Sequence, residues 1–69
     1  MARPLTARIV AKLKEHPDCW MTSQQLSKYL NLTTGQTGYY LRILLAEGVV
    51  EYNIIHGKPG QWRLAPEQK

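Results

Sequence analysis

Gly48 divides this chain into two parts with different hydrophobic periodicity. Before it, apolar residues recur at spacings of three and four positions, which is typical of helices that bury one face. After it, residues 49–55 are mostly β-branched and aromatic, which favours a strand. With 69 residues in all, the chain has room for one small α+β domain, and a second domain is excluded.

Two helices are expected before residue 31. The first covers residues 5–15 and ends before Pro17, because proline cannot continue the helical hydrogen-bond ladder. The second covers residues 23–30 and turns Leu26 and Leu30 towards the core. The first helix is expected to be capped by Thr6 or to have Pro4 in its first turn. The second is expected to be capped by Thr22 or Ser23. The residues of the second helix that are expected to face solvent are Gln24, Gln25, Ser27 and Lys28.

A third helix is expected over residues 36–47, with Gly48 as its C-cap. Its predicted buried residues are Thr37, Leu41 and Leu44. Gly35 is assigned to the preceding turn. Gly38 lies inside the helix, where glycine costs about 1 kcal/mol of helix propensity. Two explanations for it stay open: close packing against the second helix, or access of a ligand to the backbone.

Residues 49–55 and 61–64 predict the two strands of a hairpin, joined by a turn of glycine, proline and basic residues over 56–60. Trp62 is assigned to the core, because a two-stranded sheet needs a large apolar anchor over the helices. Three helices followed by a C-terminal two-stranded β-hairpin describe a winged helix-turn-helix. The predicted organisation is one such domain over residues 1–65 and a polar tail over 66–69.

The residue inventory argues against catalysis and metal binding. Cys19 cannot form an internal disulfide, and together with His16 and His56 it offers no spacing typical of zinc sites. It is interpreted as a partly buried structural cysteine. The five acidic residues form no acid–base or nucleophilic constellation, so no enzyme activity and no cofactor are assigned. No apolar run approaches a membrane span and no signal peptide is recognisable, so a cytoplasmic location is expected.

The net charge of +4, from nine basic and five acidic residues, favours an acidic partner such as DNA. In a helix-turn-helix the second helix of the pair enters the major groove and its outward side chains reach the base edges. The third helix takes that place here. Gln suits adenine, Arg suits guanine or phosphate, and Tyr stacks or binds phosphate. The predicted outward positions are Gln36, Gly38, Tyr39 and Arg42, with Tyr40 at the margin.

Thr33 and Thr34 precede this helix and are candidates for phosphate contact through their hydroxyl and backbone N–H groups. Helix capping is an equally weighted alternative for both.

Basic residues outside the third helix add candidate phosphate contacts. Lys58, with His56, stands at the tip of the predicted wing, and Arg63 stands on the returning strand. Arg3 and Arg8 belong to a basic N-terminal run, for which a solvated helix face is the alternative.

The stretch from Thr33 to Val50, TTGQTGYYLRILLAEGVV, resembles the recognition helix and following turn of the FaeA-like, or PapI-like, fimbrial regulators. Its best-matching features are Gln36, the triplet Tyr39-Tyr40-Leu41 and the exit at Gly48. Residues 60–64, GQWRL, are similar to the Trp-bearing second strand of that family, so that the resemblance covers about residues 20–64.

This resemblance implies a small bacterial winged-helix regulator of pilus operons. Such a protein acts on DNA together with a leucine-responsive global regulator in methylation-dependent phase variation. The resemblance also gives Gln36, Tyr39 and Tyr40 a DNA-facing role. The family tends to carry a basic residue where this chain has Gly38.

Pro59 and Trp62 look like the proline and tryptophan in the wing of Z-DNA-binding winged domains. Those domains also need an Asn and a Tyr on the recognition helix, and this chain has Gly38 and Arg42 at those places. The Z-DNA interpretation is therefore rejected.

The function predicted from the sequence is a small DNA-binding transcription regulator of a bacterium, phage or plasmid. Its recognition helix would lie in the major groove of double-stranded DNA and its wing on the backbone. A module of this size offers modest contact area, so a self-dimer or a DNA-bound partner is expected to add affinity. The alternative is a winged-helix adaptor that binds another protein through exposed apolar residues, for which the candidates are Ile43, Ile54 and Ile55.

Overall fold

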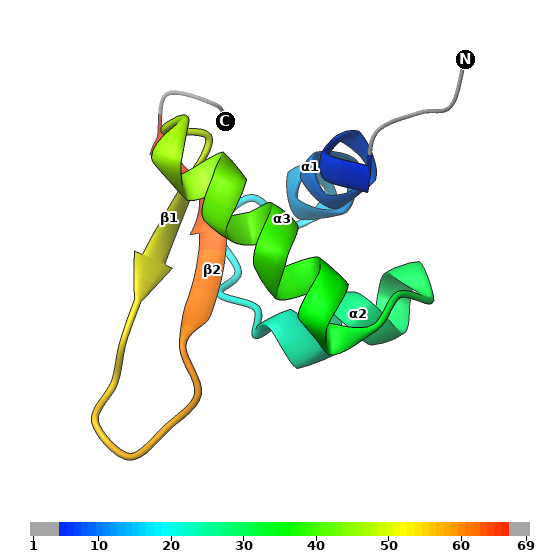
Figure 1. Cartoon of the computed structure of the whole chain (residues 1–69). Coiled ribbons are helices and arrows are strands. Elements are labelled where there is room, and N and C mark those ends of the chain that lie inside the picture. The colour runs from blue at the N-terminus through cyan, green and yellow to red at the C-terminus, as the bar shows by residue number, and fades with distance from the viewer. Residues whose placement is uncertain (1–4, 67–69) are drawn as a thin grey trace.

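The computed structural model describes residues 5–66 and places three helices before a two-stranded antiparallel sheet (Figure 1). The elements are α1 (Leu5–Glu15), α2 (Ser23–Leu30), α3 (Thr34–Ala46), β1 (Val50–Asn53) and β2 (Gln61–Leu64). This arrangement is the winged helix-turn-helix that the sequence predicts. Arg3 and Pro4 lie outside the described residues, as does most of the predicted tail.

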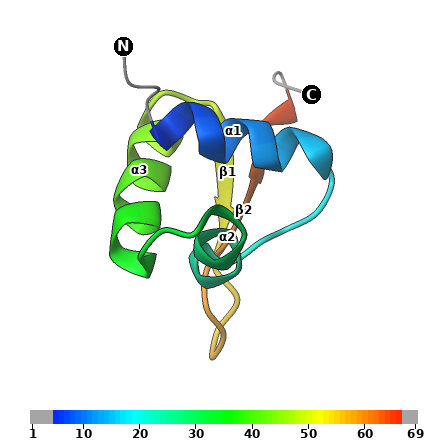
Figure 2. The ribbon, with the colours of Figure 1, turned by 90° about the vertical axis from the view of Figure 1, so that its right-hand side faces the viewer.

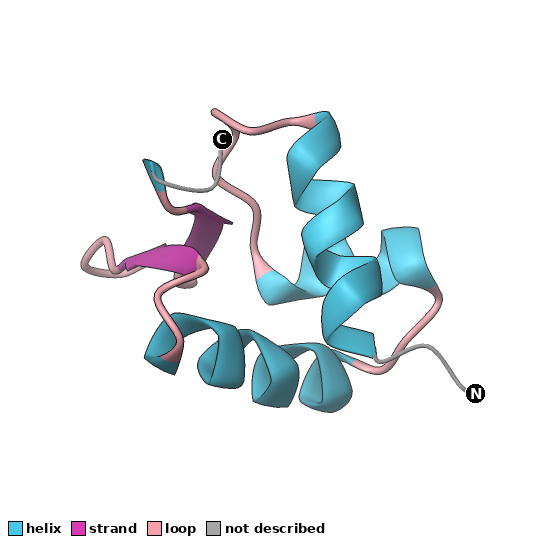
Figure 3. Cartoon of the chain, turned by 90° about the horizontal axis from the view of Figure 1, so that it is seen from above, coloured by secondary structure: helices cyan, strands magenta, loops and turns pink. Residues whose placement is uncertain are grey.

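The three helices lie together on one side of the sheet, as seen from above in Figure 3. In Figure 2, α1 crosses one end of the molecule, and the loop between β1 and β2 projects at the opposite end. The helix pair α2 and α3 lies between these two ends. The loop is thus well placed to act as the wing beside α3.

The sheet register gives its two faces different roles. Val50 is opposite Leu64 and Tyr52 is opposite Trp62, and this face packs on the helices. Glu51 is opposite Arg63 on the outer face. On the edge of β2 that does not pair with β1, Met21 forms a short antiparallel bridge to Trp62. Its N–H donates to the carbonyl of Trp62 at 2.9 Å.

The core forms where the inner face of this sheet meets the three helices. Trp62 is 6% exposed and belongs to this core, as predicted. The fully or nearly fully buried apolar residues are Ile9, Leu13, Met21, Leu26, Leu30, Leu41, Leu44, Val50, Trp62 and Leu64. The predicted inward face of α3 is confirmed, including Thr37, whose hydroxyl donates to the carbonyl of Thr33 at 2.9 Å.

The start of α3 differs from the prediction. The helix begins at Thr34, two residues before the predicted start at Gln36. Gly35 therefore lies in its first turn instead of in the preceding loop. The reason is a capping box: the side chains of Thr33 and Gln36 each accept a hydrogen bond from the other's backbone N–H. The helix ends at Ala46, one residue earlier than predicted, with Glu47 as the cap residue. Gly48 follows with a left-handed φ of 79°, and its N–H donates to the carbonyl of Leu45.

Other local predictions need correction. Ser27 is buried, because its hydroxyl donates to the carbonyl of Gln24 at 2.7 Å and needs no water. Thr6 lies inside α1 and does not precede it. The first strand ends at Asn53, which leaves Ile54 and Ile55 in the exposed loop.

Cys19 also differs from its prediction, because it is exposed instead of partly buried. Within residues 5–66 no helix has the length and apolar character needed to cross a membrane.

Candidate nucleic-acid interface

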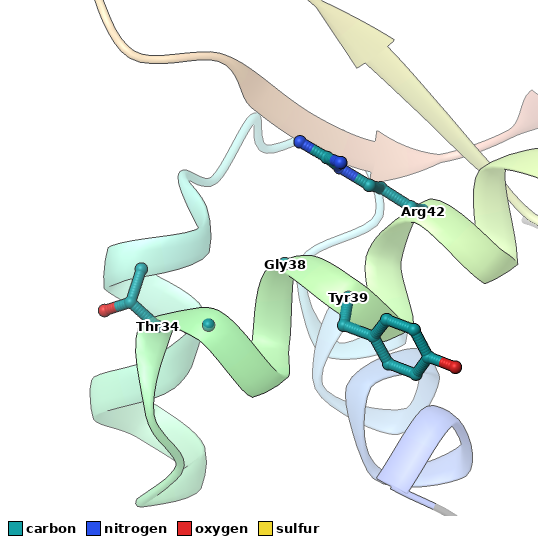
Figure 4. Close-up of a pocket in the computed structure, with 5 residues that line it drawn as sticks. Thr34, Gly38, Tyr39 and Arg42 are labelled. Carbon is teal, nitrogen blue, oxygen red and sulfur yellow. The ribbon is translucent and has the colours of Figure 1, made fainter.

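The outer face of α3 carries an open concavity of about 400 Å³ (Figure 4). It lies on the side of the helix away from the buried Thr37, Leu41 and Leu44. Its lining consists of Thr34, Gly35, Gly38, Tyr39 and Arg42. Three of these, Gly38, Tyr39 and Arg42, are positions that the sequence predicts to face a ligand, and Thr34 is a predicted phosphate contact.

Gly38 leaves the backbone of α3 uncovered in this concavity. A Cβ added at Gly38 or at Gly35 would meet no atom within 4 Å, so neither glycine packs closely against α2. Positive φ angles among the glycines of the described chain occur at Gly48 and Gly57, so Gly38 is not required by its backbone conformation either. The packing explanation for Gly38 is therefore wrong, and access of a ligand to the backbone stays a prediction.

Arg42 and Tyr39 supply the polar groups of this face. In Figure 4 the Arg42 side chain extends from α3 towards the hairpin, whereas Tyr39 points away from it. Arg42 is exposed and makes no hydrogen bond or ion pair with residues 5–66. Tyr39 is 63% exposed, and its ring meets the Tyr40 ring edge-on at a centroid distance of 5.1 Å. Tyr40 is half-buried against the core, so it holds Tyr39 and offers less surface itself.

Thr33 and Gln36 are engaged with each other at the start of α3. The Oε1 atom of Gln36 accepts from the backbone N–H of Thr33 at 3.2 Å and from its hydroxyl at 3.3 Å. A bidentate pairing with adenine needs the oxygen as well as the NH₂ group of a Gln side chain. Gln36 would therefore have to leave the capping box to bind adenine in that way. Its contact with DNA stays a prediction.

Lys58 lies in the loop that forms the wing. Its backbone N–H donates to the carbonyl of Ile55 at 2.9 Å, which tightens the turn. Its side chain is exposed and, like that of Arg42, has no partner within residues 5–66. His56, on the same loop, is also exposed. The wing projects beyond α2 (Figure 2) and therefore presents the cation of Lys58 at that end of the molecule.

Arg8 and Arg63 already serve the fold. Arg8 donates to the carbonyl of Leu30 at 2.9 Å and so joins α1 to the end of α2. Arg63 pairs with Glu51 through two hydrogen bonds of 3.0 and 3.1 Å, and its guanidinium lies 4.3 Å from the ring centroid of Trp20. Because this pair occupies the outer face of the sheet, Arg63 points away from α3. The DNA contacts of Arg8 and Arg63 stay predictions, and that of Arg3 lies outside the described residues.

Tyr52 is a surface residue that the sequence analysis did not single out. It is 40% exposed although it shares the inner face of the sheet with the buried Val50. The strand alternation from Val50 signals its direction, but the alternation does not show that the core ends before Tyr52 is covered.

Within residues 5–66 no cluster of three or more metal-ligating side chains occurs.

Other shallow concavities include one of about 350 Å³ between α1 and the end of α3, lined mainly by small and aliphatic residues. It lacks the combination of a cation and an exposed aromatic ring found on α3.

Comparison with solved structures finds proteins that share this fold. The Zα domain of zebrafish PKZ is 26% identical, with a TM-score of 0.79, and the alignment covers 88% of this chain and 91% of that one. A protein of Methanosarcina mazei Go1 described as a possible transcriptional regulator is 17% identical, with a TM-score of 0.80. That alignment covers 97% of this chain and 60% of the other. No protein-family model and no curated protein matches the chain.

These similarities support the winged-helix architecture and do not confirm the FaeA-like subfamily. The side chains on α3 bear separately on Z-DNA binding. The exclusion of Z-DNA binding rests on Gly38 and Arg42, and it stays a prediction beside the similarity to a Zα domain.

Proposed function

We propose that this chain binds double-stranded DNA and regulates transcription, with α3 in the major groove and the wing along the backbone. The observation that carries the proposal is the open concavity on α3. It combines uncovered backbone at Gly38 with the exposed ring of Tyr39 and the cation of Arg42, which has no partner within residues 5–66. An α-helix fits the major groove, and such groups bind phosphates and base edges. The M. mazei protein of the same fold, described as a possible transcriptional regulator, supports the regulatory part.

The setting is a bacterium, phage or plasmid, as the resemblance to FaeA-like regulators implies. One small module contributes limited contact area, because single domains of this kind bury on the order of 600–1,000 Å² on DNA. A second copy of the chain or a leucine-responsive-type regulator bound to adjacent DNA supplies the remaining affinity and specificity.

A titration of random duplex DNA with the full chain, followed by fluorescence anisotropy at about 50 and 200 mM salt, tests the proposal. Phosphate contacts release counterions, so the affinity is expected to fall steeply at the higher salt concentration. Absence of binding at both salt concentrations would overturn the DNA-binding function.

The exposed isoleucines favour one alternative, a protein-binding adaptor. Ile54 is 70% and Ile55 42% exposed on the wing, whereas Ile43 is half-buried. An apolar contact with a protein is far less sensitive to salt than a contact with phosphates. The affinity for a partner protein, measured at the same two salt concentrations, therefore distinguishes the two functions.

A further inference from the structure

Tyr52 is an exposed aromatic residue on a face of the sheet that is otherwise buried. The register pairs it with Trp62 and pairs Val50 with Leu64, so these four side chains point to the helix side of the sheet. Val50, Trp62 and Leu64 are at most 6% exposed, whereas Tyr52 keeps 40% of its surface in solvent. Of these four side chains, Tyr52 alone is placed to meet a ligand.

The ring of Tyr52 is held in one position by the opposite strand. Its centroid lies 4.2 Å from that of Trp62, with 37° between the planes. The ring and hydroxyl also cover Gly60, where an added Cβ would overlap them. An aromatic ring packed over a glycine of the neighbouring strand stabilises a hairpin and sets its register. The hydroxyl is therefore preorganised near the base of the wing.

Exposed cations occur before and after Tyr52 in the chain, on the two elements that β1 connects. Arg42 extends from α3 towards the hairpin (Figure 4), and Lys58 follows β1 in the wing. β1 packs beside α3, because the N–H of Val49 donates to the carbonyl of Leu44 at 2.9 Å and turns the chain back along the helix. The Tyr52 hydroxyl makes no hydrogen bond within residues 5–66, so its proton is available for an acceptor.

We propose that the Tyr52 hydroxyl donates a hydrogen bond to a backbone phosphate of the duplex that α3 binds. This inference rests on the proposed DNA-binding function and adds a residue to it. Arg42 and Lys58 attract the phosphates of one strand, and Tyr52 fixes the position of that strand between α3 and the wing. The contact sets the orientation of the protein on DNA and carries no base preference.

The substitution Tyr52→Phe tests this contact, because it keeps the ring on Trp62 and Gly60 and removes the hydroxyl alone. Loss of one hydrogen bond is expected to weaken DNA binding by about two- to tenfold. A neutral donor releases no counterion, so the slope of log affinity against log salt should stay unchanged. Lys58→Ala should instead lower that slope by about one unit.

Tyr29→Phe is the matched control. Tyr29 is 61% exposed on α2, where Lys12 lies 5.1 Å from its ring, and its substitution should leave DNA binding unchanged. Equal thermal midpoints for Tyr52→Phe and the unmodified chain would show that both are folded. Unchanged affinity of Tyr52→Phe, with weakened binding of Lys58→Ala, would overturn this inference and leave the proposed function standing. Failure of the unmodified chain to bind DNA would overturn both.

Discussion

Thr33 and Gln36 cap α3 reciprocally. The backbone N–H of Gln36 donates to the Thr33 hydroxyl at 3.0 Å, and the backbone N–H of Thr33 donates to Gln36 Oε1 at 3.2 Å. Two of the N–H groups that a helix start leaves without helical acceptors are thereby satisfied. Residues predicted as DNA contacts thus have a structural role at the edge of the candidate interface.

Replacing Thr33 by Ala should lower the free energy of unfolding by about 1 kcal/mol, because the cap hydroxyl is lost. Urea denaturation followed by circular dichroism measures the change. Gln36→Glu is the matched control, since Glu also completes a capping box and should keep most of the stability. A Thr33→Ala protein as stable as the unmodified chain would contradict the capping role.

Gly38→Ala should raise the free energy of unfolding by about 0.5–1 kcal/mol, because Ala favours the helix and its Cβ meets open space. Thermal unfolding measures this effect, and Gly35→Ala near the helix start provides a comparison. If the uncovered backbone at Gly38 approaches DNA, the same variant should bind duplex DNA more weakly than Gly35→Ala does. A stabilised Gly38→Ala protein with full affinity would show that the backbone is not approached.

Arg42→Ala and Lys58→Ala should each weaken binding to random duplex DNA, because both side chains are exposed cations without partners in the described chain. Each is expected to reduce the salt dependence of binding by about one unit of slope. Anisotropy titrations at several salt concentrations give both quantities. If neither variant loses affinity while the unmodified chain binds, the DNA-binding face lies elsewhere, with the basic N-terminus as the next candidate.

Arg63→Ala should lower the free energy of unfolding by about 1 kcal/mol, because the side chain joins Glu51 and the ring of Trp20 while about a quarter exposed. Its effect on DNA affinity should be smaller than that of Arg42→Ala, since it lies on the outer face of the sheet. Urea unfolding and the anisotropy titration separate the two roles. A loss of affinity as large as that of Arg42→Ala, without loss of stability, would restore the predicted DNA contact of Arg63.

A duplex held in the left-handed Z form should bind no better than the same sequence in the right-handed form. The reason is that α3 carries Gly38 and Arg42 where Z-DNA-binding winged domains need an Asn and a Tyr. Competition between the two forms at one salt concentration measures the preference. A clear preference for the left-handed form would overturn the exclusion made from these two residues.

The helices and their inward faces could be predicted from local patterns alone. The spacing of Leu26 and Leu30, the stop at Pro17 and the glycine at position 48 act within a few residues, and α1 and α2 have the predicted bounds. The predicted start of α3 is two residues later than the observed start at Thr34. The sequence prediction includes capping by Thr33 and omits its reciprocal pairing with Gln36.

The candidate site was predictable in part. The outer side of α3 follows from local sequence, because helical periodicity separates Gly38, Tyr39 and Arg42 from the buried Leu41. Which cations are available for a ligand depends on contacts between elements that are remote in the chain. Packing brings Arg8 to the carbonyl of Leu30 and places the outer sheet face, with Arg63, beside Trp20.

The open space at Gly38 and the exposure of Tyr52 also depend on tertiary packing. Each is set by which segments, remote in sequence, lie beside the residue. Local periodicity gives the direction of a side chain, whereas its exposure depends on what the rest of the chain places in front of it.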